Sequence, residues 1–301
     1  MSSRSLYAAL ERLTRAENGR LAASSLTKAQ QRALDELART TGAVSFIRQG
    51  RGCVYEVRDP EVLDIWWRRL CPSDPGDLPA DMPDRAANVA IRRDSKGGQH
   101  KHEHAYLLLK ASGAPVSWSD DRAILGLTQA TRDFGVAALA IHPEDAWISD
   151  QPLWLIENQA LFDRTDWLEH NGPVTLCYYG GQLSGRLLAW LAHRPRAPEI
   201  VLFADYDGIG LMNYCRLLAQ GGDGARFYLM ADWQAKLGRF GNPDLWQRTR
   251  EDFARAAALL PEGDAYAPVR ALMVAMQRLG KALEQEAIWL SPVEDQADDP
   301  D

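Results

Sequence analysis

The sequence predicts an α/β protein, in which a parallel sheet covered by helices follows a smaller α+β region and precedes a group of helices. In the second half of the chain, short apolar runs alternate with amphipathic stretches. Near-continuous apolar runs are typical of parallel strands that are buried on both faces. The chain has 301 residues, of which 46% are hydrophobic, so it can form two domains with a core in each.

The predicted strands of the second half are residues 153–156, 174–178, 200–203 and 227–230, with helices at 159–169, 182–193 and 211–220 between them. We assign residues 151–235 to this sheet domain. The periodic stretches 244–260 and 267–290 predict C-terminal helices within residues 236–290. Residues 294–301 contain five acids and no base, so we expect residues 291–301 to form a disordered acidic tail.

The first 84 residues have a different pattern of apolar residues. Leucines at helical spacing predict helices at 5–18 and 27–40, and β-like runs follow at 44–47 and 53–57. The connecting residues between these runs are basic and glycine-rich, which indicates a hairpin with a charged tip. Helices followed by such a hairpin are typical of a winged helix, a DNA-binding region in which Arg48 and Arg51 would contact DNA. A plain charged turn is the alternative.

The Pro-rich segment 71–84 is the strongest linker signal, and we place a domain boundary there. Within the connecting region 85–150, the apolar runs 89–92 and 106–109 predict a second hairpin with a basic tip. We expect four cations of this tip to contact phosphate, with a solvated turn as the alternative. They are Arg92, Arg93, Lys96 and Lys101.

Composition excludes several classes of protein. The formal charge of −7 argues against a protein that coats nucleic acid indiscriminately, although residues 24–58 hold six basic residues against three acids. Four separated cysteines predict neither a disulfide framework nor a zinc site. No apolar run suits a signal peptide or a membrane span, so we expect a cytoplasmic protein with no membrane partner.

Acidic side chains follow two of the predicted strands. Glu157 comes directly after the first strand, and Asp205 and Asp207 follow the third. The carboxyl ends of parallel strands meet at one edge of a sheet, and ligands bind there. Carboxylate oxygens are the ligands that Mg²⁺ prefers, and a divalent cation would relieve their mutual repulsion. The alternative is that these acids only cap helices.

These motifs resemble those of a known family. The segments LWLIEN, YYGGQLSGRLLAWL and IVLFADYDGIGLMNY, within residues 153–230, are similar to Toprim domains, which have a Rossmann-like parallel sheet. More narrowly, they resemble the Toprim region of JetD and MksG, the nuclease subunits of the Wadjet and MksBEFG plasmid-defence systems, which are topoisomerase VI A-like. The order of an N-terminal winged-helix-like region and a C-terminal Toprim domain agrees with that family.

The resemblance implies a Mg²⁺-dependent DNA endonuclease, with Mn²⁺ as a possible substitute. Asp205 and Asp207 would hold Mg²⁺, and Glu157 would hold a second ion or act as general base. Four supporting residues would orient Glu157, bring the backbone close to phosphate or start the next helix. They are Asn158, Gly180, Gly181 and Gly208.

The resemblance also implies partners: double-stranded DNA, a second copy of the chain, and SMC-like ATPase, kleisin and small winged-helix subunits of a defence complex. Two alternatives remain open. One is a topoisomerase VI A-like tyrosine transesterase, for which Tyr55 and Tyr106 are candidates by location only. The other is a non-catalytic DNA-binding or assembly subunit with a degenerate site.

The chain departs from the family at one metal ligand. Some Toprim domains carry a third acid two residues beyond the second aspartate, where this chain has Ile209. Asp232 is one possible replacement. The number of bound metal ions therefore stays open.

Overall fold

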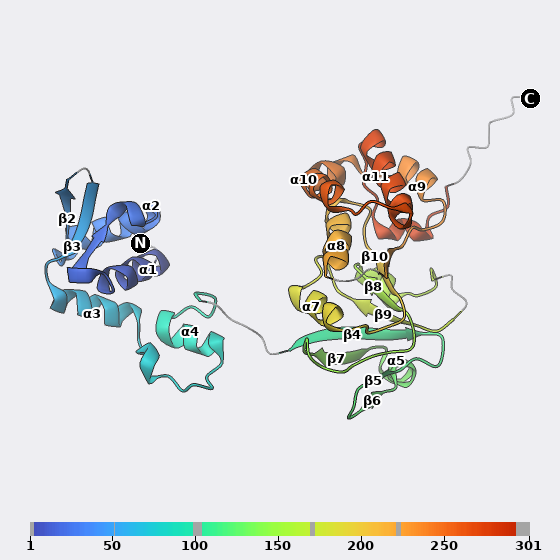
Figure 1. Ribbon diagram of the computed structural model, residues 1–301, viewed down its shortest axis with the longest axis horizontal. Coiled ribbons are helices and arrows are strands. Elements are labelled where there is room, and N and C mark those ends of the chain that lie inside the picture. Colours follow the sequence, from blue (N-terminus) through green and yellow to red (C-terminus); the bar gives the residue numbers. More distant parts are fainter. Residues whose placement is uncertain (1–2, 51, 99–103, 169–171, 221–223, 293–301) are drawn as a thin grey trace, which may run out of the picture. The chain divides into compact units, whose positions relative to one another are not determined.

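The computed structural model describes residues 3–50, 52–98, 104–168, 172–220 and 224–292, and the chain divides into two compact units, residues 1–102 and 103–301 (Figure 1). The division falls after the Pro-rich segment that we predicted as the boundary. That segment belongs to the first unit because Cys71 is buried and Ser73 N donates a hydrogen bond to Ala90 O at 3.1 Å.

The first unit begins with the predicted helices and hairpin. Its elements up to residue 70 are α1 (Ser3–Thr14), β1 (Arg20–Ala22), α2 (Lys28–Thr41), β2 (Val44–Gln49), β3 (Gly52–Val57) and α3 (Pro60–Leu70). Strands β2 and β3 form an antiparallel hairpin, with β1 on the other side of β3. Thr27 starts α2 with a capping box, as its sequence position predicts. The leucines of α1 and α2 are buried against the sheet. The assignment as a winged helix stays a prediction.

The prediction of a second hairpin is wrong. Residues 89–92 are not a strand but the end of helix α4 (Asp84–Arg92), which begins after Pro83. Its apolar run is part of a longer helical period, RAANVAIR, and Pro83 and Asp84 give a typical helix start. The other half of the expected hairpin is a strand, β4 (Ala105–Ser112), but it belongs to the sheet of the second unit.

The second unit is built on a six-stranded mixed sheet with the order β11–β10–β8–β9–β4–β7. Four strands are parallel to one another: β8 (Leu153–Ile156), β9 (Val174–Tyr178), β10 (Ile200–Phe203) and β11 (Ala225–Phe227). The first three lie where they were predicted, whereas β11 shares only Phe227 with the predicted strand 227–230. The sheet is not parallel throughout, because β4 pairs antiparallel with β9 and with β7 (Ala137–Ile141). The architecture is thus α/β with a mixed sheet.

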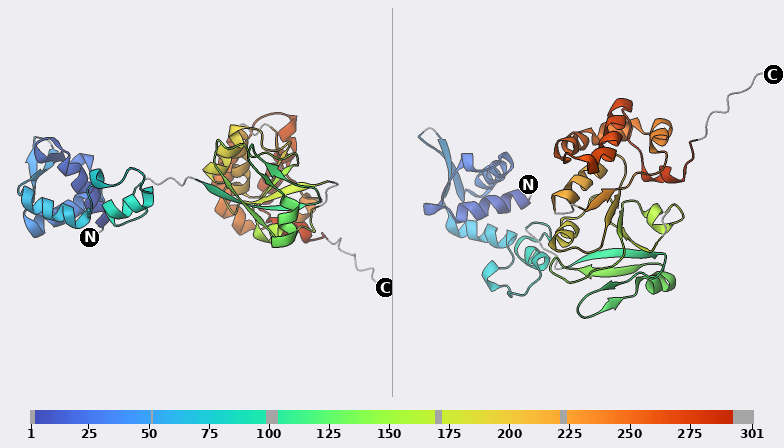
Figure 2. Two further views of the ribbon diagram at one scale, coloured as in Figure 1. Left: turned by 90° about the horizontal axis from the view of Figure 1, so that it is seen from below. Right: turned by 45° about the vertical axis from the view of Figure 1, so that its right-hand side comes forward.

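Helices cover this sheet, and α8 to α11 lie together at the end of the unit beyond β10 (Figure 1; right-hand view of Figure 2). The remaining elements of this unit are β5 (Trp118–Ser119), β6 (Ile124–Leu125), α5 (Leu127–Phe134), α6 (Gln159–Asp163), α7 (Gly185–His193), α8 (Gly208–Ala219), α9 (Trp233–Phe240), α10 (Pro243–Leu259), α11 (Ala267–Leu279) and the 3-10 helices η4 (Asp264–Tyr266) and η5 (Gln285–Trp289). The predicted helix 267–290 ends early because Gly280 adopts a left-handed backbone at φ 62°.

Two further sequence expectations concern membrane spans and the acidic tail. No described helix combines the length and the apolar character that a membrane span requires. Most of the acidic tail, residues 293–301, lies outside the described residues.

Candidate active site

The predicted acids of the second unit come together at the carboxyl ends of β8 and β10. These strands are adjacent and parallel, with Ile156 opposite Phe203. Glu157 directly follows β8, and its Oε2 accepts a hydrogen bond from the backbone N–H of Asp205 at 3.3 Å. The sheet register therefore places the two carboxylates side by side.

Asp207 belongs to the same cluster and also caps a helix. Its side chain is 4% exposed, and its Oδ1 accepts a hydrogen bond from Gly210 N at 2.8 Å in the first turn of α8. Burial raises the pKa of Asp207, and the hydrogen bonds from Gly210 and Ile209 oppose that shift. The helix-cap interpretation is thus correct for Asp207, although it does not remove the residue from the acidic cluster.

Residues from the C-terminal end of the chain complete the site, and sequence reasoning missed them. Gln285 is fully buried: its backbone N–H donates to Asp205 Oδ1 at 2.8 Å, and its side-chain Oε1 accepts from Asn158 N at 2.9 Å. Its Nε2 donates to the backbone oxygen of Phe203. Gln285 therefore connects the ends of β8 and β10. The break of α11 at Gly280, just before Leu-Glu-Gln-Glu, is the signal that could have separated these residues from the predicted helix.

Glu286 adds a fourth carboxylate. Asn158, which we expected to orient Glu157, instead donates from Nδ2 to Glu286 Oε1, and its own Oδ1 accepts from Ala160 N at 2.9 Å. The second oxygen, Glu286 Oε2, is buried and has no hydrogen-bond partner. A buried oxygen without a partner is costly, and a cation or a donor from a ligand would satisfy it.

The carboxylates repel one another in a poorly solvated place. Burial raises the pKa of Glu157 to about 7, with repulsion from Asp207 and Glu286 acting in the same direction. Burial raises the pKa of Asp205 to about 8, and the charges of Glu157, Asp207 and Glu286 add to the shift. Among the described residues, no lysine or arginine forms an ion pair with any of the four. Within the described part of the chain, the cluster thus lacks a counter-charge.

A tyrosine also lies in the cluster. The hydroxyl of Tyr179, the residue after β9, donates to Glu157 Oε2 at 3.0 Å. Burial and then the charge of Glu157 raise the pKa of Tyr179 well above its ordinary value. The two tyrosines considered from sequence lie in other surroundings. Tyr55 is 1% exposed and donates to Asp35 at 2.7 Å, whereas Tyr106 is 73% exposed.

The glycines of the site have distinct roles. Gly180 and Gly181 form the turn after β9 with φ of 59° and 71°, which L-residues rarely adopt. Gly208 starts α8, as predicted from its position after the second aspartate. A Cβ atom on Gly208 would lie 2.0 Å from Thr249 O and 2.5 Å from Phe253 N, so this glycine permits the close packing of α8 on α10.

The donor set matches a hard divalent cation in its chemistry. All four carboxylates offer oxygen ligands, and Glu286 has an oxygen without a partner. In the described part of the chain, however, no three His, Cys, Asp or Glu side chains are arranged as a metal-binding group. One oxygen of each carboxylate is occupied by a protein donor, so the ligands for a metal would be the remaining oxygens. Ile209 is half-buried in the position of the missing acid, and Asp232 is exposed.

The predicted DNA-contacting residues all belong to the first unit. Arg48 is exposed on β2, and Arg93 and Lys96 are exposed after α4. Arg92 is half-buried and donates to Gly97 O at 2.6 Å. Arg51 and Lys101 lie outside the described residues. No protein-family model matches the chain, and no curated protein matches it either.

Proposed function

We propose that this protein is a metal-dependent DNA endonuclease that hydrolyses phosphodiester bonds. One observation carries the proposal: a cluster of carboxylates at the ends of two adjacent parallel strands, with Glu157 and Asp205 half-buried and Asp207 buried, has no basic partner among the described residues. A cluster of this kind is stabilised either by protons or by a divalent cation. Asp205, Asp207, Glu157 and Glu286 are the residues that would hold Mg²⁺ or Mn²⁺.

The protein groups have separate tasks in this proposal. When bound, the cation supplies Lewis-acid polarisation of the phosphodiester. Glu157 would either hold the cation or accept the proton of the attacking water; burial raises its pKa to about 7 in the metal-free protein, and a bound cation would lower that pKa. The Tyr179 hydroxyl and the Asp205 N–H fix the orientation of Glu157 Oε2.

The partners follow from the resemblance to JetD and MksG. We propose that exposed cations of the first unit, Arg48, Arg93 and Lys96, hold double-stranded DNA through its phosphates. A homodimer would cut both strands. An SMC-like ATPase, a kleisin and a small winged-helix subunit would complete a cytoplasmic defence complex.

Cleavage of circular plasmid tests the proposed function. Wild-type protein with Mg²⁺ or Mn²⁺ should nick or linearise the plasmid, and EDTA should stop the reaction. Asp205→Asn keeps the acceptor for Gln285 N but removes the charge, so cleavage should fall by roughly 100-fold or more.

The matched control is Asp121→Asn. This acid is exposed in the second unit and is not part of the acidic cluster. Its cleavage rate should equal that of the wild type. Equal cleavage by the Asp205→Asn variant would contradict the assignment of the site.

Tyr179 supports a second candidate, a tyrosine transesterase, because its hydroxyl lies within hydrogen-bond distance of Glu157. This function predicts a covalent protein–DNA adduct that protease removes. A plasmid that stays intact with every metal, while DNA binding persists, would instead support a non-catalytic subunit.

A further inference from the structure

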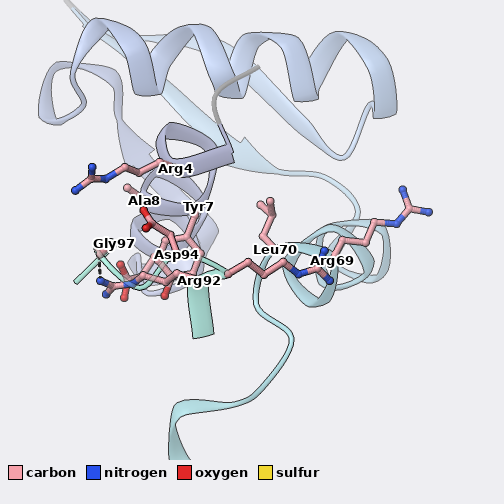
Figure 3. Close-up of a pocket in the computed structure, with 10 residues that line it drawn as sticks. Arg4, Tyr7, Ala8, Arg69, Leu70, Arg92, Asp94 and Gly97 are labelled. Carbon is pink, nitrogen blue, oxygen red and sulfur yellow. Dashed lines mark hydrogen bonds between the residues drawn. The ribbon is translucent and has the colours of Figure 1, made fainter. Parts of the chain in front are cut away.

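A pocket in the first unit is lined by residues from three helices and the turn after α4 (Figure 3). Its volume is about 440 Å³. Tyr7 and Leu70 contribute apolar surface, and four arginines contribute positive charge: Arg4, Arg69, Arg92 and Arg93. The pocket lies within residues 4–97 and shares no residue with the acidic cluster.

Among the described residues, arginines outnumber acids in the lining of the pocket. Its lining contains four arginines against two acids, Glu11 and Asp94. Glu11 pairs with Arg15 at 3.2 Å, and Asp94 Oδ1 accepts from Lys96 N at 2.9 Å. Within the described chain, none of the four arginines forms an ion pair with an acid. The pocket therefore favours an anion.

The N-terminus of α1 adds to the preference of the pocket for an anion. Arg4 lies in the first turn of α1, which has no acidic residue. The N-terminal end of a helix carries partial positive charge, and a cation there is unfavourable unless an anion lies nearby. Arg4 is exposed, so its guanidinium is accessible to a ligand.

Arg92 forms the inner wall of the pocket. Its guanidinium carbon lies 5.2 Å from the Tyr7 ring centroid, and Tyr7 in turn stacks on Trp67 at 5.2 Å. One guanidinium nitrogen donates to Gly97 O at 2.6 Å, which fixes the side chain. Arg92 Nε is buried and has no hydrogen-bond partner. A ligand oxygen in the pocket would satisfy this donor.

Size and chemistry together select the ligand class. A pocket of this volume holds one small molecule or one nucleotide unit, whereas a duplex cannot enter it. A guanidinium group binds phosphate through two parallel hydrogen bonds, and a nucleobase can stack on apolar or guanidinium groups. We propose that this pocket binds a nucleoside monophosphate unit through its terminal phosphate. The unit comes either from a free nucleotide or from the 5′-phosphorylated end of a DNA strand.

Calorimetric titration of the full chain in EDTA tests this site independently of the acidic cluster. The probes are dAMP, deoxyadenosine and inorganic phosphate. We expect dAMP to bind at least about tenfold more tightly than either of the others, because only dAMP offers both the phosphate and the base. Asp205→Asn should bind dAMP like the wild type, which separates this site from the proposed nuclease centre.

Arg4→Glu is the decisive variant. An acid in the first turn of α1 is favourable for the helix, so this change should not destabilise α1. We expect dAMP affinity to fall by at least about tenfold. The control is Arg32→Glu, because Arg32 is exposed on α2 and does not line the pocket.

Short duplexes with and without a 5′-phosphate identify the source of the ligand. Displacement of dAMP by the phosphorylated duplex alone supports a DNA-end site, and dAMP binding without displacement by either duplex supports a free-nucleotide site. The proposal is overturned if deoxyadenosine or inorganic phosphate binds as tightly as dAMP, or if Arg4→Glu binds dAMP like the wild type.

Discussion

The Tyr179 hydroxyl is a neutral donor to Glu157, and this hydrogen bond lowers the pKa of Glu157 against the larger effect of burial. In the Tyr179→Phe variant we therefore expect the pKa of Glu157 to rise above about 7. A larger fraction of Glu157 is then protonated at pH 7 than in the wild type. Cleavage should fall by roughly tenfold at pH 7 and recover as the pH is raised.

The pH–rate profile of plasmid cleavage measures this shift. Tyr178→Phe is the matched control, since Tyr178 is the neighbouring residue and its hydroxyl has no hydrogen bond in the described structure. An unchanged profile would show that Tyr179 does not act on Glu157. Complete loss at every pH, together with loss of a covalent adduct, would support the transesterase.

At the residue scale, part of the site could be predicted from sequence. Glu157 and Asp205 directly follow apolar runs whose carboxyl ends must meet in a parallel sheet, so local pattern locates them. Gln285 and Glu286 could not be located this way. They bond to residues 80 and 128 positions earlier, and only tertiary packing of η5 determines that pairing.

Helix α8 packs closely on α10, whereas α9 has open space at its glycine. Replacing the first glycine of α8 or the glycine of α9 by alanine should therefore change the free energy of unfolding in opposite directions. In Gly208→Ala the new Cβ meets backbone atoms of α10 at 2.0 and 2.5 Å, which forces the helices apart. The free energy of unfolding should fall by about 3 kcal/mol. In Gly238→Ala the Cβ enters open space within α9, and the free energy of unfolding should rise by about 0.5–1 kcal/mol.

Urea denaturation of the two variants measures this contrast. Alanine in place of glycine does not lower helix propensity at either position, so a loss of stability in Gly208→Ala alone would come from packing. If both variants gained stability equally, the close approach of α8 to α10 would be contradicted.

At the element scale, helix and strand identity could be predicted where the local period was clear, as for α2 and the parallel strands β8, β9 and β10. The prediction was wrong for residues 89–92, where a short apolar run of α4 is compatible with either a strand or a helix. The sheet was predicted as parallel because β4 and β7 were not recognised as its members. Strand partners depend on long-range pairing, which a local pattern does not contain.

The whole molecule should respond to pH through its acidic cluster. The pKa of Glu157 is raised from 4.5 to about 7 and that of Asp205 from 3.8 to about 8, so the folded protein binds more protons than the unfolded chain between these values. Stability from these groups is fully present below about pH 4 and is lost as the pH rises through 7 and 8. Metal-free protein should therefore melt at a lower temperature at pH 8 than at pH 6.

Thermal melting in EDTA and with added Mg²⁺ or Mn²⁺ checks this expectation. A cation that binds the ionised carboxylates should raise the melting temperature by several degrees, and more at pH 8 than at pH 6. Asp205→Asn should weaken both dependences. A melting temperature that rises from pH 6 to pH 8 in EDTA would contradict the proposed electrostatics.

The position of Gln285 near the end of the chain determines when during synthesis the site can be completed. The sheet strands β8 and β10 leave the ribosome long before the residue that joins their ends, since Asn158 and Gln285 are 127 positions apart. During synthesis the carboxylates are thus present on a nascent chain whose strand ends are not yet connected. The arrangement at the ends of β8 and β10 is completed only when η5 has been translated and has docked, so a chain cut short before residue 285 would retain these strands without their connecting residue.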